Sequence, residues 1–163
     1  RRGAAPDRRA QDGGARRGAP LVLAWPGAEA PLAWAAAEAD SIARLHGVRP
    51  IPADSASERR VWGALFAAPV VHVVAHGQAS DDPRWARDST GVWLRPDPAG
   101  ARAPGAPRAG DGFLSMGELL DAAAVRRLAA ELVVLSACET GVGQASRSEG
   151  TIGLQRALLA AGA

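Results

Sequence analysis

Continuous apolar runs are the clearest feature of the hydrophobic pattern. Residues 70–75 read Val-Val-His-Val-Val-Ala and residues 132–137 read Leu-Val-Val-Leu-Ser-Ala. Short apolar runs that end in turn residues are typical of strands buried on both faces. Shorter runs predict a strand over 21–25, a weaker one over 48–51 and an edge strand over 91–95. The chain therefore has a series of buried strands.

Between these runs, apolar residues recur at helical spacing. The stretch from Pro31 to about His46 predicts a helix with one apolar stripe. Ser55-x-x-Glu58 and Ser115-x-x-Glu118 both match the capping box, so each predicts the start of a helix. A last helix is predicted after residue 148. The alternation of strands and helices predicts an α/β fold with a mostly parallel sheet covered on both faces.

Two segments lack this periodicity. Residues 77–112 predict a loop with an edge hairpin, and residues 1–19 predict a disordered Arg/Gly/Ala/Pro linker. Residues 20–163 are then one domain, long enough to bury a core. Because the chain starts with Arg rather than Met and residues 160–163 form no natural stop, we expect it to be a fragment of a longer protein.

Charge and cysteine content narrow the class of protein. Six Arg and two Asp fall within residues 1–17, so the net charge of +2 comes from this segment. The predicted domain therefore has no basic face suited to nucleic acid. A single Cys excludes an intrachain disulfide framework and fits a reducing compartment. Without a membrane span or a signal peptide in the sequence, we expect a cytoplasmic protein.

Candidate chemistry lies where the two main strands end. His76 follows the first strand and Cys138 follows the second. In parallel sheets, active sites gather at the carboxyl ends of strands. There a His could act as the base for a Cys nucleophile, with the N–H groups of Gly77 and Cys138 as an oxyanion hole. The alternative is that Cys138 is a small, inert core residue.

Other polar residues allow weaker predictions. His72 and His76 are four apart, but along a strand this spans roughly 13 Å, too far for one metal ion. We expect His72 to be a core histidine and no metal or organic cofactor to be needed. Asp81, Asp82 and Asp88 could line a substrate pocket for a basic side chain or form a solvated turn. Glu139, a further candidate for substrate binding, could orient His76 or accept hydrogen bonds from backbone amides of its own turn.

The motifs at the strand ends resemble those of the CHAT domain, a caspase-like cysteine peptidase family often attached to tetratricopeptide repeats. The resemblance runs from about Pro20 to the end and is carried by residues 71–77, 132–141, 149–154 and 159–163. It implies a caspase-type three-layer α/β/α sandwich, with His76 and Cys138 as catalytic residues. Members of the family usually continue with another strand and more helix, so the resemblance implies that this domain is incomplete at the C-terminus.

We therefore expect a cysteine endopeptidase domain that hydrolyses protein or peptide substrates through a His76–Cys138 dyad. The resemblance also implies a repeat region or activator as a possible partner in a longer protein. The main alternative is a non-catalytic signalling or interaction module of the same family. A Rossmann-like binder of small molecules is disfavoured because the sequence has no phosphate-binding loop.

Overall fold

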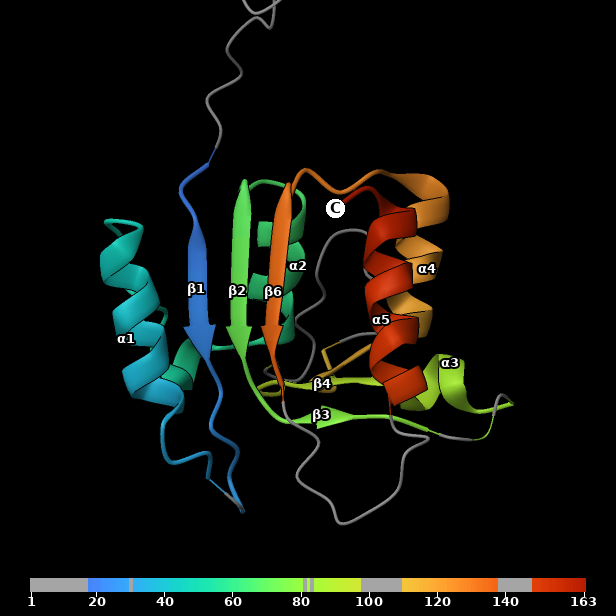
Figure 1. Ribbon diagram of the computed structural model, residues 1–163, viewed down its shortest axis with the longest axis horizontal. Coiled ribbons are helices and arrows are strands. Elements are labelled where there is room, and N and C mark those ends of the chain that lie inside the picture. Colours follow the sequence, from blue (N-terminus) through green and yellow to red (C-terminus); the bar gives the residue numbers. More distant parts are fainter. Residues whose placement is uncertain (1–17, 30, 81, 83, 98–109, 138–147) are drawn as a thin grey trace, which may run out of the picture.

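A computed structural model describes residues 18–29, 31–80, 82, 84–97, 110–137 and 148–163. Helices and strands alternate through most of these ranges (Figure 1). The elements are β1 (Leu21–Ala24), α1 (Ala35–Leu45), the short 3-10 helix η2 (Ala53–Ser55), α2 (Glu58–Leu65), β2 (Val70–Val74), β3 (Gly77–Gln78), α3 (Ala86–Ser89), β4 (Gly91–Trp93), β5 (Phe113–Ser115), α4 (Met116–Val125), β6 (Leu132–Ser136) and α5 (Ser148–Ala161).

The three main apolar runs form a parallel sheet in the order β1-β2-β6. Their arrows point the same way in Figure 1. The predicted strand over 48–51 is reduced to one bridge, between Leu23 and Ile51. Pro50 and Pro52 flank Ile51, and proline has no backbone N–H to donate to a sheet ladder. The prediction of a parallel sheet is thus confirmed.

Alternate residues of the strands pack on opposite faces of this sheet. Val22, Ala24 and Val74 pack against α1 through the alanines at 35, 39 and 43. Leu23 and Val73 belong to a larger core that includes Trp62 of α2 and apolar residues of α4 and α5. This two-sided burial explains why β1 and β2 are continuously apolar. The strand predicted at 132–137 forms as β6 but is half-buried rather than buried, because it is the last strand of the described sheet. The protein is a mixed α/β fold with a parallel sheet.

A second, antiparallel sheet lies at the carboxyl end of the first one (Figure 1). Its order is β3-β4-β5, with Gly77 opposite Val92 and Val92 opposite Leu114. It confirms the expected hairpin in the 77–112 segment. Because β3 follows β2 after only two residues, this small sheet lies beside the end of β2.

The two predicted capping boxes have different outcomes. Ser115 caps α4: its Oγ accepts from the Glu118 N–H, and the Glu118 carboxylate accepts from the Ser115 N–H at 2.9 Å. The prediction of a capping box at Ser55 is wrong. The N-cap of α2 is Ser57, and the Ser55 hydroxyl donates to Asp54 instead. The 3-10 turn over 53–55 displaces the helix start by two residues.

Because Ser115 caps a helix and Ser55 does not, replacing each by Ala should change the stability of the protein by different amounts. We expect Ser115→Ala to lower the free energy of unfolding by about 1–2 kcal/mol, because it removes a buried cap. Ser55→Ala, which removes a hydroxyl from an exposed turn contact, is the matched control and is expected to cost less than about 0.5 kcal/mol. Urea unfolding of both variants measures the difference. Equal losses would contradict the assignment of the cap.

None of the helices in the described ranges has the length and apolarity to cross a membrane.

Candidate functional site

His76 lies where the parallel sheet passes into the antiparallel one. Just before it, the Ala75 N–H donates to the Ser136 carbonyl at 3.1 Å, which continues the pairing of β2 with β6. The carbonyl of His76 itself accepts from the Trp93 N–H at 2.8 Å, which begins the pairing of β3 with β4. The His76 residue is half-buried. Its backbone is therefore held between two sheets, and the residue as a whole is only partly covered.

The end of β6 approaches the chain right after His76. A Cβ built on Gly77 would lie 3.2 Å from the Cβ of Ala137 and 3.6 Å from its carbonyl oxygen. Glycine at position 77 permits this close approach. Ala137 directly precedes Cys138, which lies outside the described residues, as do Asp81 and Glu139. The two neighbours of the predicted dyad in sequence, Gly77 and Ala137, are thus in contact range.

The pairing pattern also sets the direction of the Gly77 N–H. Gly77 faces Val92, and the flanking bond runs from the Trp93 N–H to the His76 carbonyl. In an antiparallel pair flanked in this way, the facing residues direct their own N–H groups away from each other. The Gly77 N–H consequently points away from β4. This is compatible with the predicted role of Gly77 as an oxyanion donor, which stays a prediction.

The structure separates His72 from His76. His72 is buried on β2, and its Nε2 lies 3.1 Å from Oε1 of Glu38 on α1. This confirms that His72 is a core histidine with a polar partner. Within the described ranges, no three His, Cys, Asp or Glu side chains gather in a group able to hold a metal ion.

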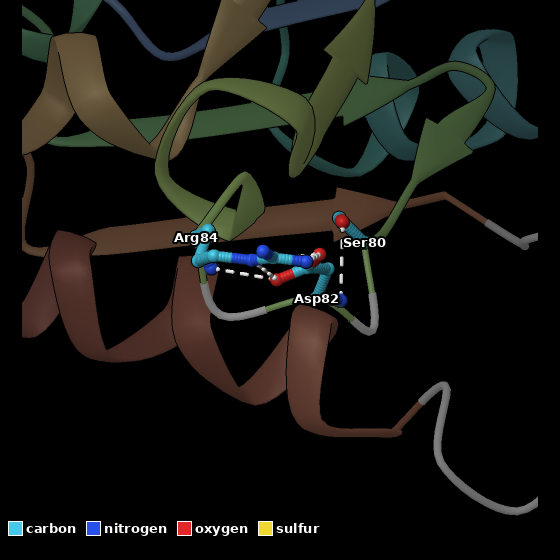
Figure 2. A network of polar contacts seen from close by, with 3 residues as sticks. All are labelled: Ser80, Asp82 and Arg84. Atoms are coloured by element: carbon cyan, nitrogen blue, oxygen red, sulfur yellow. Dashed lines mark hydrogen bonds and ion pairs between the residues drawn. The ribbon is translucent and has the colours of Figure 1, made fainter.

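Asp82 is engaged with its own turn. Figure 2 shows its carboxylate beside the guanidinium of Arg84, with a shortest distance of 2.7 Å, and its N–H directed to the Ser80 hydroxyl. The hydrogen bond from Arg84 holds the pKa of Asp82 below its usual range. The Arg84 charge thus offsets the charge of Asp82, which reduces what Asp82 can offer to a basic ligand. Its predicted role in substrate binding stays a prediction.

Sequence reasoning missed a buried carboxylate, Glu58. Only 1% of this residue is exposed. Its two oxygens accept from the Trp62 indole N–H and from the Gly112 N–H, both at 3.2 Å. Burial and the nearby Glu118 raise the pKa of Glu58 to about 7. The four-residue spacing between Glu58 and Trp62 could have indicated this contact. Instead, the Ser55-x-x-Glu58 pattern led to the prediction that Glu58 forms a capping box with Ser55.

Sequence reasoning also missed a pocket beside Gly77. It lies between β3, β4, β6 and α5 and has a volume of about 100 Å³. Gly77 and Ala137 are part of its wall. No motif could have signalled it, because its lining comes from four segments that are distant in sequence.

A comparison with models of protein families gives a match. The model of the CHAT domain matches residues 2–163, which is nearly the whole chain. Neither the comparison with curated proteins nor that with solved structures gives a significant match.

Proposed function

The chain belongs to the CHAT domain family, and we propose that it is a cysteine endopeptidase domain that works through His76 and Cys138. The family is caspase-like and peptidase-related. The observation that carries the proposal is the pairing of β2 with β6, since it brings together the two strands that lead into these residues.

The register of this pairing supports the dyad. Val70 lies opposite Leu132 and Val74 opposite Ser136, so the offset between the strands is 62 positions. His76 and Cys138 are separated in sequence by the same offset. Each is two residues past the end of its strand. A parallel pair kept in this register brings an imidazole and a thiol to the same level of the sheet.

The proposed reaction uses these two side chains and backbone N–H groups. His76 takes the proton of Cys138, and the thiolate attacks the carbonyl carbon of a peptide bond. The N–H groups of Gly77 and Cys138 stabilise the oxyanion. His76 then protonates the leaving amine, and water hydrolyses the thioester to free the acid and restore the thiol.

Membership of the CHAT family also suggests how the helices are layered around the parallel sheet. We propose that α1 forms one outer layer of a caspase-type α/β/α sandwich, and that α2, α4 and α5 belong to the other. The substrate is a protein or peptide, and no cofactor takes part. A repeat region or activator in a longer protein would regulate the site, and the single Cys fits the reducing cytoplasm.

The proposal is tested by the reactivity of the single thiol. We expect iodoacetamide to alkylate Cys138 with a rate that rises around a pH below 7, because His76 stabilises the thiolate. In His76→Ala, the midpoint should rise by about two pH units, towards the ordinary thiol pKa of about 8.5. Whole-protein mass spectrometry measures the rate without ambiguity, because Cys138 is the only Cys.

His46→Ala is the matched control for this experiment. His46 is an exposed residue at the C-cap of α1, and its loss should leave the midpoint unchanged. If the wild type and His76→Ala share one midpoint near the ordinary thiol value, the dyad is not formed. A non-catalytic interaction module of the CHAT family would then be the better assignment.

A further inference from the structure

The pocket beside Gly77 is placed where a peptide substrate would be cleaved. Gly77 and Ala137 line it, and these residues are adjacent in sequence to His76 and Cys138. If the Gly77 N–H binds the oxyanion, the residue that supplies the scissile carbonyl lies next to Gly77. The side chain of this substrate residue is attached to the Cα that is bonded to the scissile carbonyl carbon. The pocket is therefore within reach of this one side chain of the substrate.

Five aliphatic side chains form much of the described lining of the pocket. Val92 of β4, Val133 and Leu135 of β6, and Leu154 and Leu158 of α5 contribute to its described lining. None of the described lining residues carries a charge. Moving an ionised side chain from water into such surroundings is strongly unfavourable unless a partner charge is present. The lining therefore favours an uncharged side chain.

Two of the polar side chains in the described lining, Gln78 and Thr90, already have partners within the protein. The Thr90 hydroxyl accepts from the Ser80 N–H at 3.2 Å. The amide of Gln78 accepts from the Trp93 indole and donates to the Ser89 carbonyl. A polar ligand would have to compete for these groups, whereas an aliphatic one leaves them intact. Gln155, which is exposed, is the remaining polar side chain in the described lining.

Size narrows the class of side chain further. The pocket volume of about 100 Å³ is below the ~150 Å³ of a cavity that accepts benzene. One aliphatic side chain such as that of Val, Leu or Met fits this scale better than an indole or a phenyl ring. Among the described acidic residues, Asp82 is the nearest in sequence to Gly77. It is paired with Arg84 and is not part of the described lining.

We propose that this pocket is the specificity subsite of the domain and that it receives the uncharged aliphatic side chain of the residue whose carbonyl is attacked. This proposal rests on the proposed peptidase function. It differs from the preference for a basic residue that Asp81, Asp82 and Asp88 suggest in the sequence.

The test uses peptidyl chloromethyl ketones that differ only in the residue next to the reactive group. We expect the Leu probe to label Cys138 at least tenfold faster than the Arg, Asp, Phe and Trp probes, since a mismatch in such a pocket typically costs 10- to 200-fold. Mass spectrometry of the intact protein gives the rates. Iodoacetamide labelling of the same samples separates probe recognition from the intrinsic reactivity of the thiol.

Two variants link the preference to the pocket. Leu135→Ala removes part of the floor and should raise the ratio of the Phe rate to the Leu rate about tenfold. Gln155→Glu places one charge at the exposed rim and should raise the ratio of the Arg rate to the Leu rate. Because Gln155 is exposed on α5, this second variant keeps the fold if Leu135→Ala does not.

The outcomes separate the two proposals. Alkylation that depends on His76, together with equal rates for all probes or a preference for Arg, would overturn the subsite and leave the peptidase intact. Ratios unchanged by both variants would also overturn it. Alkylation that is indifferent to His76 would overturn the peptidase function and the subsite with it.

Discussion

Peptide hydrolysis by this protein is expected to fall to the background rate in Cys138→Ala and to fall by about 10²–10⁴ in His76→Ala. The first change removes the nucleophile, and the second removes the base that forms the thiolate and the acid that protonates the leaving amine. Cleavage of a denatured protein substrate, followed by mass spectrometry of the products, measures both losses.

The double variant sharpens this prediction. If His76 acts through Cys138, the double variant should be no slower than Cys138→Ala alone, because the residues of a catalytic unit do not contribute additively. His72→Gln is a control on the same strand. It removes an imidazole that contacts Glu38 on α1 rather than the site, so any loss should follow stability and not the pH profile. Undiminished hydrolysis in Cys138→Ala would contradict the proposed mechanism.

The parts of the fold that the sequence predicts best are those that local patterns determine. The runs at 21–25, 70–75 and 132–137 are continuously apolar, and this composition alone predicts a parallel sheet. The first two are largely buried, whereas β6 is half-buried and begins at the exposed Leu132. The Ser115 box forms because its helix starts without a competing turn. At Ser55 the same pattern misleads, since a 3-10 turn precedes the helix and Glu58 becomes buried in the core.

Properties of the site that depend on tertiary contacts were not predictable in this way. The strand ends predict that His76 and Cys138 are near each other, but the pairing of β2 with β6 sets the register. The pocket depends on where α5, which packs against α4, lies relative to β6, and no spacing in the sequence records this. The pairing of Asp82 with Arg84, only two residues away, was a local contact that the emphasis on acidic residues overlooked.

Glu58 gives the second prediction of large effect, a dependence of stability on pH. Its pKa is about 7 in the folded protein and 4.5 in an unfolded chain, because burial and the like charge of Glu118 disfavour ionisation. Asp111, on the segment before β5, adds to the same effect. Between these pH values, the folded state holds a proton that the unfolded state has released.

The sign follows from this difference in bound protons. Below pH 4.5 both states are protonated at Glu58, so the full contribution to stability is present. As the pH rises from about 4.5 to about 7, the free energy of unfolding falls, and above pH 7 the contribution is lost. The loss amounts to at most about 3 kcal/mol, since each pKa unit corresponds to about 1.4 kcal/mol.

Urea unfolding at pH 5 and pH 8 measures this loss, and Glu58→Gln provides the comparison. Gln stays neutral at both pH values, so its free energy of unfolding should fall by up to about 3 kcal/mol less than that of the wild type. The amide introduced by Glu58→Gln has only one oxygen that can accept a hydrogen bond. One of the two hydrogen bonds from Trp62 and Gly112 is therefore lost at both pH values alike. The test is therefore the difference in pH dependence and not the absolute stability.

A second variant separates the charge of Glu118 from its role as a cap. Glu118→Gln keeps a side chain that can complete the capping box but removes the charge that raises the Glu58 pKa. We expect a pH dependence between those of the wild type and Glu58→Gln. Parallel pH dependence in all three proteins would mean that Glu58 does not hold a proton in the folded state. The ionisation of Glu58 would also affect the small sheet beside His76. Glu58 accepts a hydrogen bond from the Gly112 N–H, and the Gly112 carbonyl accepts one from the Leu94 N–H just after β4.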